Sequence, residues 1–199
     1  MSAVTFVGTS SEPQLTVRQS ELRDSLVTLV LDQGFSRFTV DDVAAALGCS
    51  KRTLYALARS KEQLATLAVR HFFRTATQQV ESAIARTRSP ARRVTRYLEA
   101  VATALRPSSP AFRADVARFA PAREIYETNT QAAAQRVREL IEEGAAAGDF
   151  RRVPGAFVAE VITATMRRIT SGEVERATGL TDAEAYTELA KLVLAAVRR

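Results

Sequence analysis

The sequence predicts an all-α protein with a small helical region near the N-terminus and a larger helical region behind it. Three observations favour this fold class. Apolar residues recur at helical spacing along most of the chain, Ser and Thr residues mark the beginning of one helix after another, and no segment of useful length alternates as a strand would. The 199 residues, 46% of them hydrophobic, are enough to bury a sizeable core.

The first helix is predicted from about Val17 to Gln33. Its apolar stripe consists of Leu22, Leu26, Leu29 and Val30. Gly34 is expected to end the helix, because glycine enters left-handed conformations without a Cβ penalty. Phe35 and Phe38 are then expected to close a small core.

Two short helices joined by a tight turn are predicted between residues 39 and 57. Thr39 is placed to cap the first helix, Gly48 to form the turn, and Ser50 to cap the second helix, from Lys51 to Leu57. A capping box formed by Ser60 and Gln63 begins a long helix after them. This pattern is typical of a helix-turn-helix.

The second short helix is expected to pack on one side and to reach outward on the other. Leu54 and Tyr55 should hold it against its neighbours, because a helix of about two turns is too short to be stable alone. Lys51, Arg52 and Thr53 lie at its N-terminal edge, where backbone N–H groups and the helix dipole also favour an anion such as a DNA phosphate.

These motifs resemble the DNA-binding domain of the TetR/AcrR family of bacterial transcriptional regulators. The matching runs are TVDDVA, the G-x-S turn, S-K-x-T-L-Y and S-K-E-x-L, at the family's spacing from about Leu22 to Leu64. The chain departs from the family at residues 56–58, where Ala-Leu-Ala replaces a common Tyr-His-Phe run, so no phosphate contact is transferred there. The residues expected to contact DNA are Thr39, Ser50, Lys51, Arg52, Thr53, Tyr55 and Lys61.

The net charge of +6 supports DNA contact only locally. Residues 1–62 contain seven Lys/Arg and seven Asp/Glu, so this region is neutral as a whole. Lys51, Arg52, Arg59 and Lys61 nevertheless fall within twelve residues that contain no acid. They form either a solvated helix face or, as the caps and the turn favour, one basic edge that meets DNA.

Helical periodicity continues to the end of the chain. Two Ser-Pro pairs, at 89–90 and 109–110, each combine an N-cap with a proline at the first helical position, and Thr181 to Glu184 is another capping box. Helices are predicted at about 60–87, 90–105, 110–118, 121–147, 154–171 and 181–198. The resemblance implies nine helices, and this count agrees.

Three regions are expected from these boundaries. Residues 1–16 form a flexible tail, residues 17–62 a three-helix DNA-binding domain, and residues 63–199 a roughly six-helix ligand-binding and dimerisation domain.

Some helices behind residue 63 carry polar groups on otherwise apolar stripes, as with Thr77, Tyr97 and Asn129. Each can bond to a neighbour in a packed core, or together they can line a mostly apolar small-molecule site. The resemblance favours the second interpretation for the group. The residues expected to bind a ligand are Phe73, Thr77, Tyr97, Val101, Phe112, Val116, Phe119, Tyr126 and Asn129.

The last two predicted helices are apolar over more than one stripe. The surplus can close the core of a monomer, but in TetR-like proteins the equivalent pair packs against a second subunit as a four-helix bundle. The resemblance therefore implies a homodimer. The residues expected at its interface are Val158, Val161, Ile162, Thr165, Ile169, Leu189, Leu192, Val193 and Ala196.

Other function classes find little support in the sequence. One cysteine, Cys49, and one histidine, His71, give no metal cluster, and neither a nucleophile with its base nor a phosphate loop is recognisable. Cys49 is expected to be a packed hydrophobe rather than a redox sensor. No signal peptide or apolar run of membrane-spanning length is present, so a cytoplasmic protein without cofactor, metal or membrane contact is expected.

The expected function is a dimeric repressor on a roughly palindromic double-stranded DNA operator, released by a small, moderately apolar effector. Two alternatives remain open. One is a ligand-independent DNA-binding dimer regulated by a protein partner, and the other is a small helical enzyme.

Overall fold

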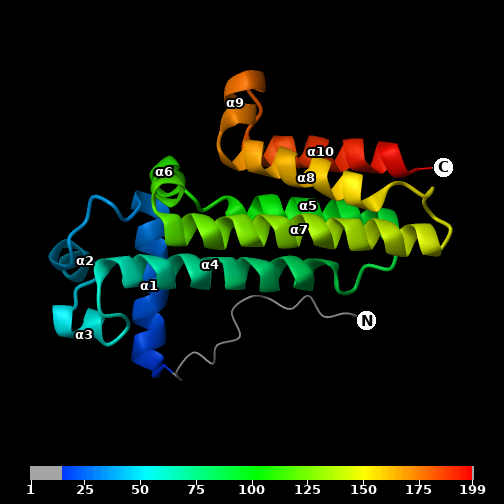
Figure 1. Ribbon diagram of the computed structural model, residues 1–199. Helices are drawn as coiled ribbons and strands as arrows, with labels where there is room; N and C mark the ends of the chain where they lie inside the picture. Colours follow the sequence, from blue (N-terminus) through cyan, green and yellow to red (C-terminus); the bar gives the residue numbers. More distant parts are fainter. Residues whose placement is uncertain (1–14, 199) are drawn as a thin grey trace. The chain divides into compact units, whose positions relative to one another are not determined.

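The computed structural model describes residues 15–198, and every regular element in that range is an α-helix (Figure 1). This confirms the predicted fold class. The helices are α1 (Val17–Gln33), α2 (Val40–Ala46), α3 (Lys51–Tyr55), α4 (Lys61–Ile84), α5 (Pro90–Leu105), α6 (Pro110–Arg118), α7 (Ala120–Ala146), α8 (Gly155–Thr170), α9 (Glu173–Thr178) and α10 (Asp182–Val197). Most of the predicted flexible tail, residues 1–14, lies outside the described residues.

The prediction of nine helices was wrong by one, because residues 15–198 contain ten. The additional helix, α9, has six residues and lies between Gly172 and Gly179. Two glycines this close together made the segment resemble a loop, and six residues are too few to show a helical period. The other predicted helices are all present, with ends that differ by a few residues.

The predicted N-caps form the expected hydrogen bonds except at Ser60, where the capping box is incomplete. The Ser60 hydroxyl accepts from the Gln63 N–H, but the Gln63 side chain accepts from the Arg59 N–H instead of the Ser60 N–H. Thr39 and Thr181 each take part in a capping box, with Asp42 and Glu184 respectively. Ser89 and Ser109 cap α5 and α6, each of which has a proline in its first turn. Local polar contacts of this kind define where the helices begin.

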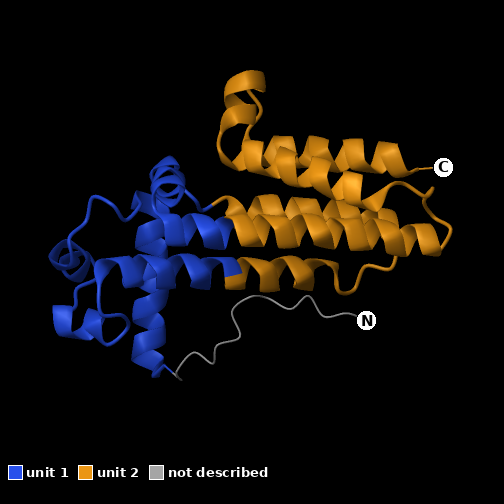
Figure 2. Cartoon of the chain, in the orientation of Figure 1, with its two compact units in different colours: residues 1–73, 107–126 blue, residues 74–106, 127–199 orange. Residues whose placement is uncertain are grey.

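The chain forms two compact units (Figure 2). Unit 1 comprises the residues up to Phe73 together with Pro107–Tyr126, and unit 2 comprises Arg74–Arg106 and Glu127–Arg199. Helices α4 and α7 each begin in unit 1 and end in unit 2. The predicted boundary after residue 62 does not coincide with this division, because α6 packs with α1.

The core of unit 1 is rich in aromatic rings. Phe72 contacts Phe112 of α6 edge to face, with ring centroids 5.9 Å apart, and Phe35 contacts Phe119 in the same way at 5.6 Å. The backbone N–H of Ser109 also donates to the carbonyl of Leu31, near the end of α1, at 2.9 Å. Helix α6 is therefore part of the core that supports the helix-turn-helix.

The core of unit 2 is formed mostly by aliphatic side chains, together with Met166 and the aromatic rings of Tyr97, Phe150 and Tyr186. Helix α10 packs along α5 and against α8. The fully buried residues of this core include Val94, Leu98, Val137, Ile162 and Val197. Among residues 15–198, no helix is long and apolar enough to cross a membrane.

Candidate DNA-binding site

The N-terminus of α2 is fixed by a reciprocal pair of hydrogen bonds. The Thr39 hydroxyl accepts from the Asp42 backbone N–H at 3.2 Å, and the Asp42 carboxylate accepts from the Thr39 N–H at 2.8 Å. Hydrogen bonds from the Thr39 backbone and side chain lower the pKa of Asp42, so the carboxylate stays charged at neutral pH. Thr39 thus orients α2 whether or not it contacts DNA.

Helix α3 is anchored through one side chain. The Ser50 hydroxyl accepts from the Thr53 N–H at 3.1 Å, and Leu54 is completely buried. The prediction that Tyr55 also holds the helix was wrong, because 46% of Tyr55 is exposed. The remaining face of α3 is therefore accessible, and it presents Lys51, Arg52 and Tyr55.

Two of the predicted DNA-binding lysines contact other parts of unit 1. Lys51 Nζ lies 2.6 Å from the Asp41 carboxylate of α2, with both side chains largely exposed. Lys61 Nζ donates to the Ser36 carbonyl at 2.6 Å. The acid-free run from Ser50 to Lys61 therefore has a carboxylate beside it in space, which the linear sequence did not reveal. Arg52 is exposed and has no ion pair among the described residues.

This unit also contains a buried carboxylate that was not predicted from the sequence. Asp115 of α6 accepts hydrogen bonds from the backbone N–H groups of Phe35 and Ser36, at 2.6 and 2.8 Å. Both amides belong to the turn between α1 and α2. A single acid within a helix gave no pattern that could connect it with residues about eighty positions away.

The charged form of Asp115 is favoured despite its burial. Burial alone would raise the pKa of the carboxyl group, but hydrogen bonds from Ser36 and Phe35 and the charge of Arg118 outweigh it. The pKa of Asp115 therefore lies below its ordinary value. The turn after α1 is held by an ionised side chain.

Five of the predicted ligand residues belong to unit 1. They are Phe73, Phe112, Val116, Phe119 and Tyr126. Phe73 contacts Tyr126 edge to face at 5.4 Å, and Phe112 and Phe119 make the ring contacts with Phe72 and Phe35 described above. Within this unit, four of the five therefore make aromatic packing contacts.

The other four predicted ligand residues belong to unit 2. Tyr97 and Val101 are buried in its core, whereas Thr77 and Asn129 are half-buried. Burial and the nearby carboxylate of Glu81 raise the pKa of Tyr97, so its phenol remains protonated at neutral pH.

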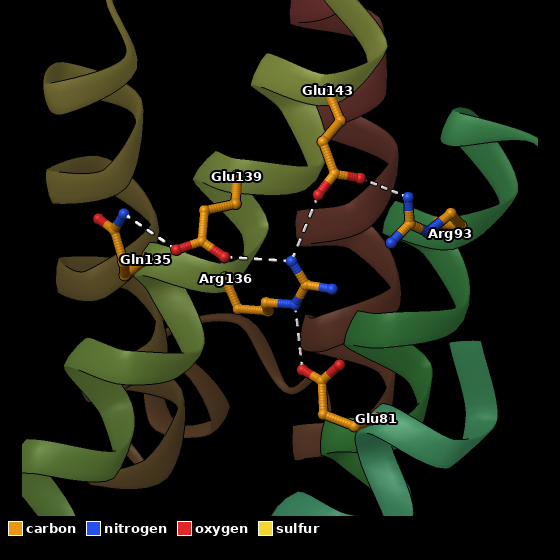
Figure 3. A network of polar contacts seen from close by, with 6 residues as sticks. All are labelled: Glu81, Arg93, Gln135, Arg136, Glu139 and Glu143. Atoms are coloured by element: carbon orange, nitrogen blue, oxygen red, sulfur yellow. Dashed lines mark hydrogen bonds and ion pairs between the residues drawn. The ribbon is translucent and has the colours of Figure 1, made fainter. Parts of the chain in front are cut away.

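A polar network joins α4, α5 and α7 of unit 2 (Figure 3). Arg136 donates to Glu81 and Glu139, each at 3.1 Å, and lies 3.5 Å from Glu143. Arg93 also pairs with Glu143. The network places several carboxylates around one guanidinium, a charged environment that the apolar stripes of these helices did not predict.

A surface groove of about 360 Å³ lies between α5 and α10 of unit 2. Arg92, Arg96 and Arg198 contribute to its lining, with Leu194 among the apolar lining residues. None of the nine predicted ligand residues lines this groove.

The predicted dimer residues divide into two groups. Ile162, Ile169, Leu189 and Val193 are buried within their own chain and offer no surface to a second subunit. They face the core rather than the outside of α8 and α10, which corrects their proposed role. Val161, Leu192 and Ala196 are exposed, and Val158 and Thr165 are half-buried. Phe157, which was not among the predicted interface residues, is 69% exposed.

Neither Cys49 nor the metal-binding residue types form a further site among residues 15–198. Cys49 is a free, half-buried thiol, and burial raises its pKa, which lowers the reactive thiolate fraction. Among residues 15–198, no group of three or more His, Cys, Asp and Glu side chains is arranged to hold a metal ion.

Residues 23–67 match the family model described as bacterial regulatory proteins, tetR family. Over 44 residues, 22% of this chain, the sequence is 57% identical to YvaF of Bacillus subtilis (strain 168), an uncharacterised HTH-type transcriptional regulator. The match spans 23% of the length of that relative. The sequence similarity to YvaF is found over these 44 aligned residues.

Solved structures share the fold over nearly the whole chain. A transcriptional regulator from Saccharomonospora viridis, solved in complex with choline, has a TM-score of 0.72 and 16% identity, covering 92% of this chain and 98% of that one. A protein from Rhodococcus sp., described as a TetR-family transcriptional regulator, has a TM-score of 0.70 and 18% identity, covering 90% of this chain and 100% of that one.

The capped α2–turn–α3 unit and the accessible face of α3 define a DNA-binding regulator of the helix-turn-helix class. Residues 23–67 match the tetR family of bacterial regulatory proteins, and the solved structures share the fold over about nine-tenths of the chain. Such regulators act by binding DNA rather than by catalysis, in agreement with the expectation from sequence.

Proposed function

We propose that the chain is a homodimeric, cytoplasmic repressor that binds a roughly palindromic DNA operator and is released from it by a small-molecule effector. The observation that carries the DNA-binding part is the asymmetry of α3. Leu54 is completely buried on one side, whereas Lys51, Arg52 and Tyr55 are exposed on the other. A short helix held in this way can place its outer face in a major groove.

The exposed residues of α3 differ in what they can recognise. Arg52 can form a bidentate pair with guanine, and Lys51 can reach a base edge or a phosphate. The Lys51–Asp41 pair is largely exposed, so its loss on DNA contact costs little. Thr53, Tyr55 and Lys61 are proposed to contact DNA phosphates. Thr39 and Ser50 cap the N-termini of α2 and α3, which are proposed to approach the DNA backbone.

DNA binding is tested by selecting sites from random duplexes and by footprinting the DNA that flanks the gene. We expect two related half-sites whose centres are about one helical turn, roughly 34–36 Å, or a multiple of it apart. Protein that binds random DNA as tightly as every selected duplex contradicts sequence-specific regulation. A single selected half-site without a repeat contradicts the symmetric dimer.

The proposed dimer face consists of exposed apolar residues on α8 and α10. Phe157 and Val161 are four positions apart on α8, and Leu192 and Ala196 are four positions apart on α10, so each pair shares one side of its helix. Phe157 and Leu192 are 69% and 68% exposed, which is unfavourable for large apolar side chains in water. An isologous contact between two such faces would bury all four residues.

The dimer is tested with Leu192→Asp, because a charge in the centre of an apolar interface opposes association. We expect the wild-type protein to have twice the 21.7 kDa chain mass and the variant to have the chain mass in sedimentation experiments. Val17→Asp is the matched control, since Val17 is also exposed but lies on α1. A wild-type monomer, or an unchanged mass in Leu192→Asp, contradicts the proposed face.

The effector proposal draws on the Saccharomonospora viridis neighbour, which was solved with choline. In this chain, the region proposed to respond comprises Thr77, Tyr97, Val101 and Asn129 of unit 2. Their side chains offer hydroxyls and one amide among apolar groups, which suits a moderately apolar molecule. The aromatic contacts of the five unit 1 residues favour a packing role for that group.

The effector is tested by linkage. A thermal-shift screen finds binders, and each binder is then added to the protein–operator complex. An effector should weaken operator binding by about 5- to 150-fold, and operator DNA should weaken effector binding by the same factor. A saturating binder that leaves operator affinity unchanged would favour the ligand-independent dimer regulated by a protein partner.

A further inference from the structure

The turn between α1 and α2 is contacted by two helices that are distant in the sequence. Asp115 of α6 accepts hydrogen bonds from the N–H groups of Phe35 and Ser36, and Lys61 of α4 donates to the carbonyl of Ser36. Ser36 therefore links a buried carboxylate to a lysine that is proposed to meet DNA. Three residues later, Thr39 caps the N-terminus of α2.

The chain leaves room for this carboxylate at one position. Gly34 has a φ of 73°, a conformation that side chains rarely adopt. A Cβ added there would lie 2.5 Å from the nearer Asp115 oxygen and 3.2 Å from the backbone of Ala111. The close approach of α6 to the end of α1 thus depends on the absence of a side chain at Gly34.

Burial makes the Asp115 contact more than a surface hydrogen bond. Only 9% of Asp115 is exposed, and both hydrogen bonds are short and lead to one carboxylate oxygen, Oδ2. Charge-assisted bonds of this kind are stronger than neutral ones, and the amides would lose their partner if the carboxylate were removed. The position of the Phe35–Ser36 backbone is therefore specified by α6.

We propose that Asp115 is a positioning residue for DNA binding, which fixes the Phe35–Ser36 turn and through it the placement of Lys61. The inference rests on the proposed DNA-binding function. Asp115 itself does not touch DNA in this scheme. Its effect reaches DNA through Ser36, whose N–H and carbonyl groups bind Asp115 and Lys61 respectively.

The sign of the expected effect separates this role from simple electrostatics. Removing an acid from a DNA-binding protein ordinarily strengthens DNA binding, because the carboxylate repels phosphates. If Asp115 positions the turn, its removal weakens binding instead. Asp32→Asn provides the matched control, because Asp32 is an exposed carboxylate on α1 of the same unit and its loss changes the charge equally.

The experiment measures operator affinity of Asp115→Ala, Asp115→Glu and Asp115→Asn at a temperature at which circular dichroism shows each to be folded. Ala lacks the acceptor and Glu displaces it by one methylene, so both should weaken binding at least about fivefold, the lower end of usual site-to-site coupling. Asn keeps an acceptor oxygen in place and should recover most of the affinity. Asp32→Asn should not weaken binding.

A double-mutant cycle tests the path through Lys61. In a Lys61→Ala background, Asp115→Glu should cost clearly less affinity than in the wild type, because the group that it displaces is already absent. Amide hydrogen exchange at Phe35 and Ser36, measured without DNA, should be faster in Asp115→Ala than in Asp32→Asn.

Several outcomes would overturn the proposal. Asp115→Glu with wild-type affinity excludes the positioning role even if Asp115→Ala does not fold. If Asp115→Glu costs the same operator affinity in the wild type and in the Lys61→Ala background, its effect does not pass through Lys61. If amide exchange at Phe35 and Ser36 is unchanged in Asp115→Ala, Asp115 does not fix the turn. Wild-type protein without operator affinity instead refutes the DNA-binding function, and with it this role.

Discussion

The two units of this protein fix their helices by different means. In unit 1, α2 has seven residues and α3 has five, and both depend on individual polar contacts such as the Thr39–Asp42 capping box and the Ser50 cap. In unit 2, α5, α8 and α10 have sixteen residues each and share a large apolar core. Short helices cannot bury enough surface to define their own position, so backbone-directed hydrogen bonds supply the specificity.

This difference explains why one unit is easier to recognise than the other. A cap or a tight turn demands particular residue types at fixed spacing, whereas a packed core accepts many combinations of apolar side chains. Accordingly, the family model matches residues 23–67, which contain the helix-turn-helix, whereas a solved structure that shares the fold over 92% of the chain is only 16% identical. Sequence similarity concentrates where the hydrogen-bonding requirements are strict.

The largest effect is expected when two completely buried leucines, Leu54 in α3 and Leu98 in α5, are each replaced by alanine. Each Leu→Ala change should lower the free energy of unfolding by about 2–5 kcal/mol, measured by urea denaturation. Their effects on DNA should differ. Leu98→Ala should leave the operator affinity of the folded protein unchanged, whereas Leu54→Ala should abolish specific binding because it removes the buried anchor of α3.

Affinities in this comparison are measured at low temperature, where circular dichroism verifies that both variants are folded. If Leu98→Ala also abolished specific binding, DNA binding would depend on the core of unit 2 as well as on unit 1, and the proposed difference between the units would be wrong. Retained specificity in Leu54→Ala would show that α3 has another anchor.

Much of unit 1 was predictable from the sequence because its signals are local. The bounds of α1 agree with the prediction, and Thr39, Gly48 and Ser50 occupy the expected positions around the turn. Long-range contacts were not predictable. The Asp115 hydrogen bonds join residues separated by 79 and 80 positions, and no local periodicity in the sequence indicates such contacts.

The spacing of apolar residues in the sequence also failed to predict which individual side chains are buried. Leu54 and Tyr55 were both expected to hold the short helix α3 against its neighbours, but of the two only Leu54 is buried. In the last helices, residues that share an apolar composition face either the core, as with Ile162, or the surface, as with Leu192. When apolar residues cover more than one stripe, spacing alone does not decide which stripe faces the core.

A smaller effect is expected from the outer face of α3, where Arg52 and Lys51 are neighbours. Arg52→Ala should cost about 1–3 kcal/mol of operator binding and relax the preference for one base pair in each half-site, as the loss of a bidentate contact with guanine would. Lys51→Ala should cost less, because a lysine presents a single charge rather than the bidentate fork of an arginine. Competition between the operator and singly substituted duplexes measures both.

Non-specific affinity provides the control for this pair of variants. Arg52→Ala should reduce the difference between operator and random DNA, whereas loss of a phosphate contact weakens both alike. If Arg52→Ala had unchanged operator affinity and unchanged base preference, Arg52 would not contact the bases, and other residues of α3 would have to do so.

The smallest effect is expected in unit 2, where Arg136 and Arg138 lie two positions apart on α7. The Arg136 side chain is 16% exposed and lies among three carboxylates, whereas Arg138 is 36% exposed and pairs with Glu142 one helical turn away. Arg136→Ala leaves those carboxylates without their shared cation and should cost about 1 kcal/mol of stability, since solvent screens part of the repulsion. Arg138→Ala should cost at most about 0.5 kcal/mol.

Urea denaturation at low and high salt measures this difference, which should shrink as salt screens the repulsion among the carboxylates. Operator affinity supplies the contrast with unit 1. Polar contacts made by Asp115 are proposed to position groups that meet DNA, whereas those made by Arg136 join α4 and α7 within unit 2, so neither arginine variant should alter operator binding by the folded protein. Equal destabilisation by the two variants would mean that the Arg136 network adds no more than an ordinary surface pair. A loss of operator affinity in Arg136→Ala alone would instead connect this network to the DNA-binding function.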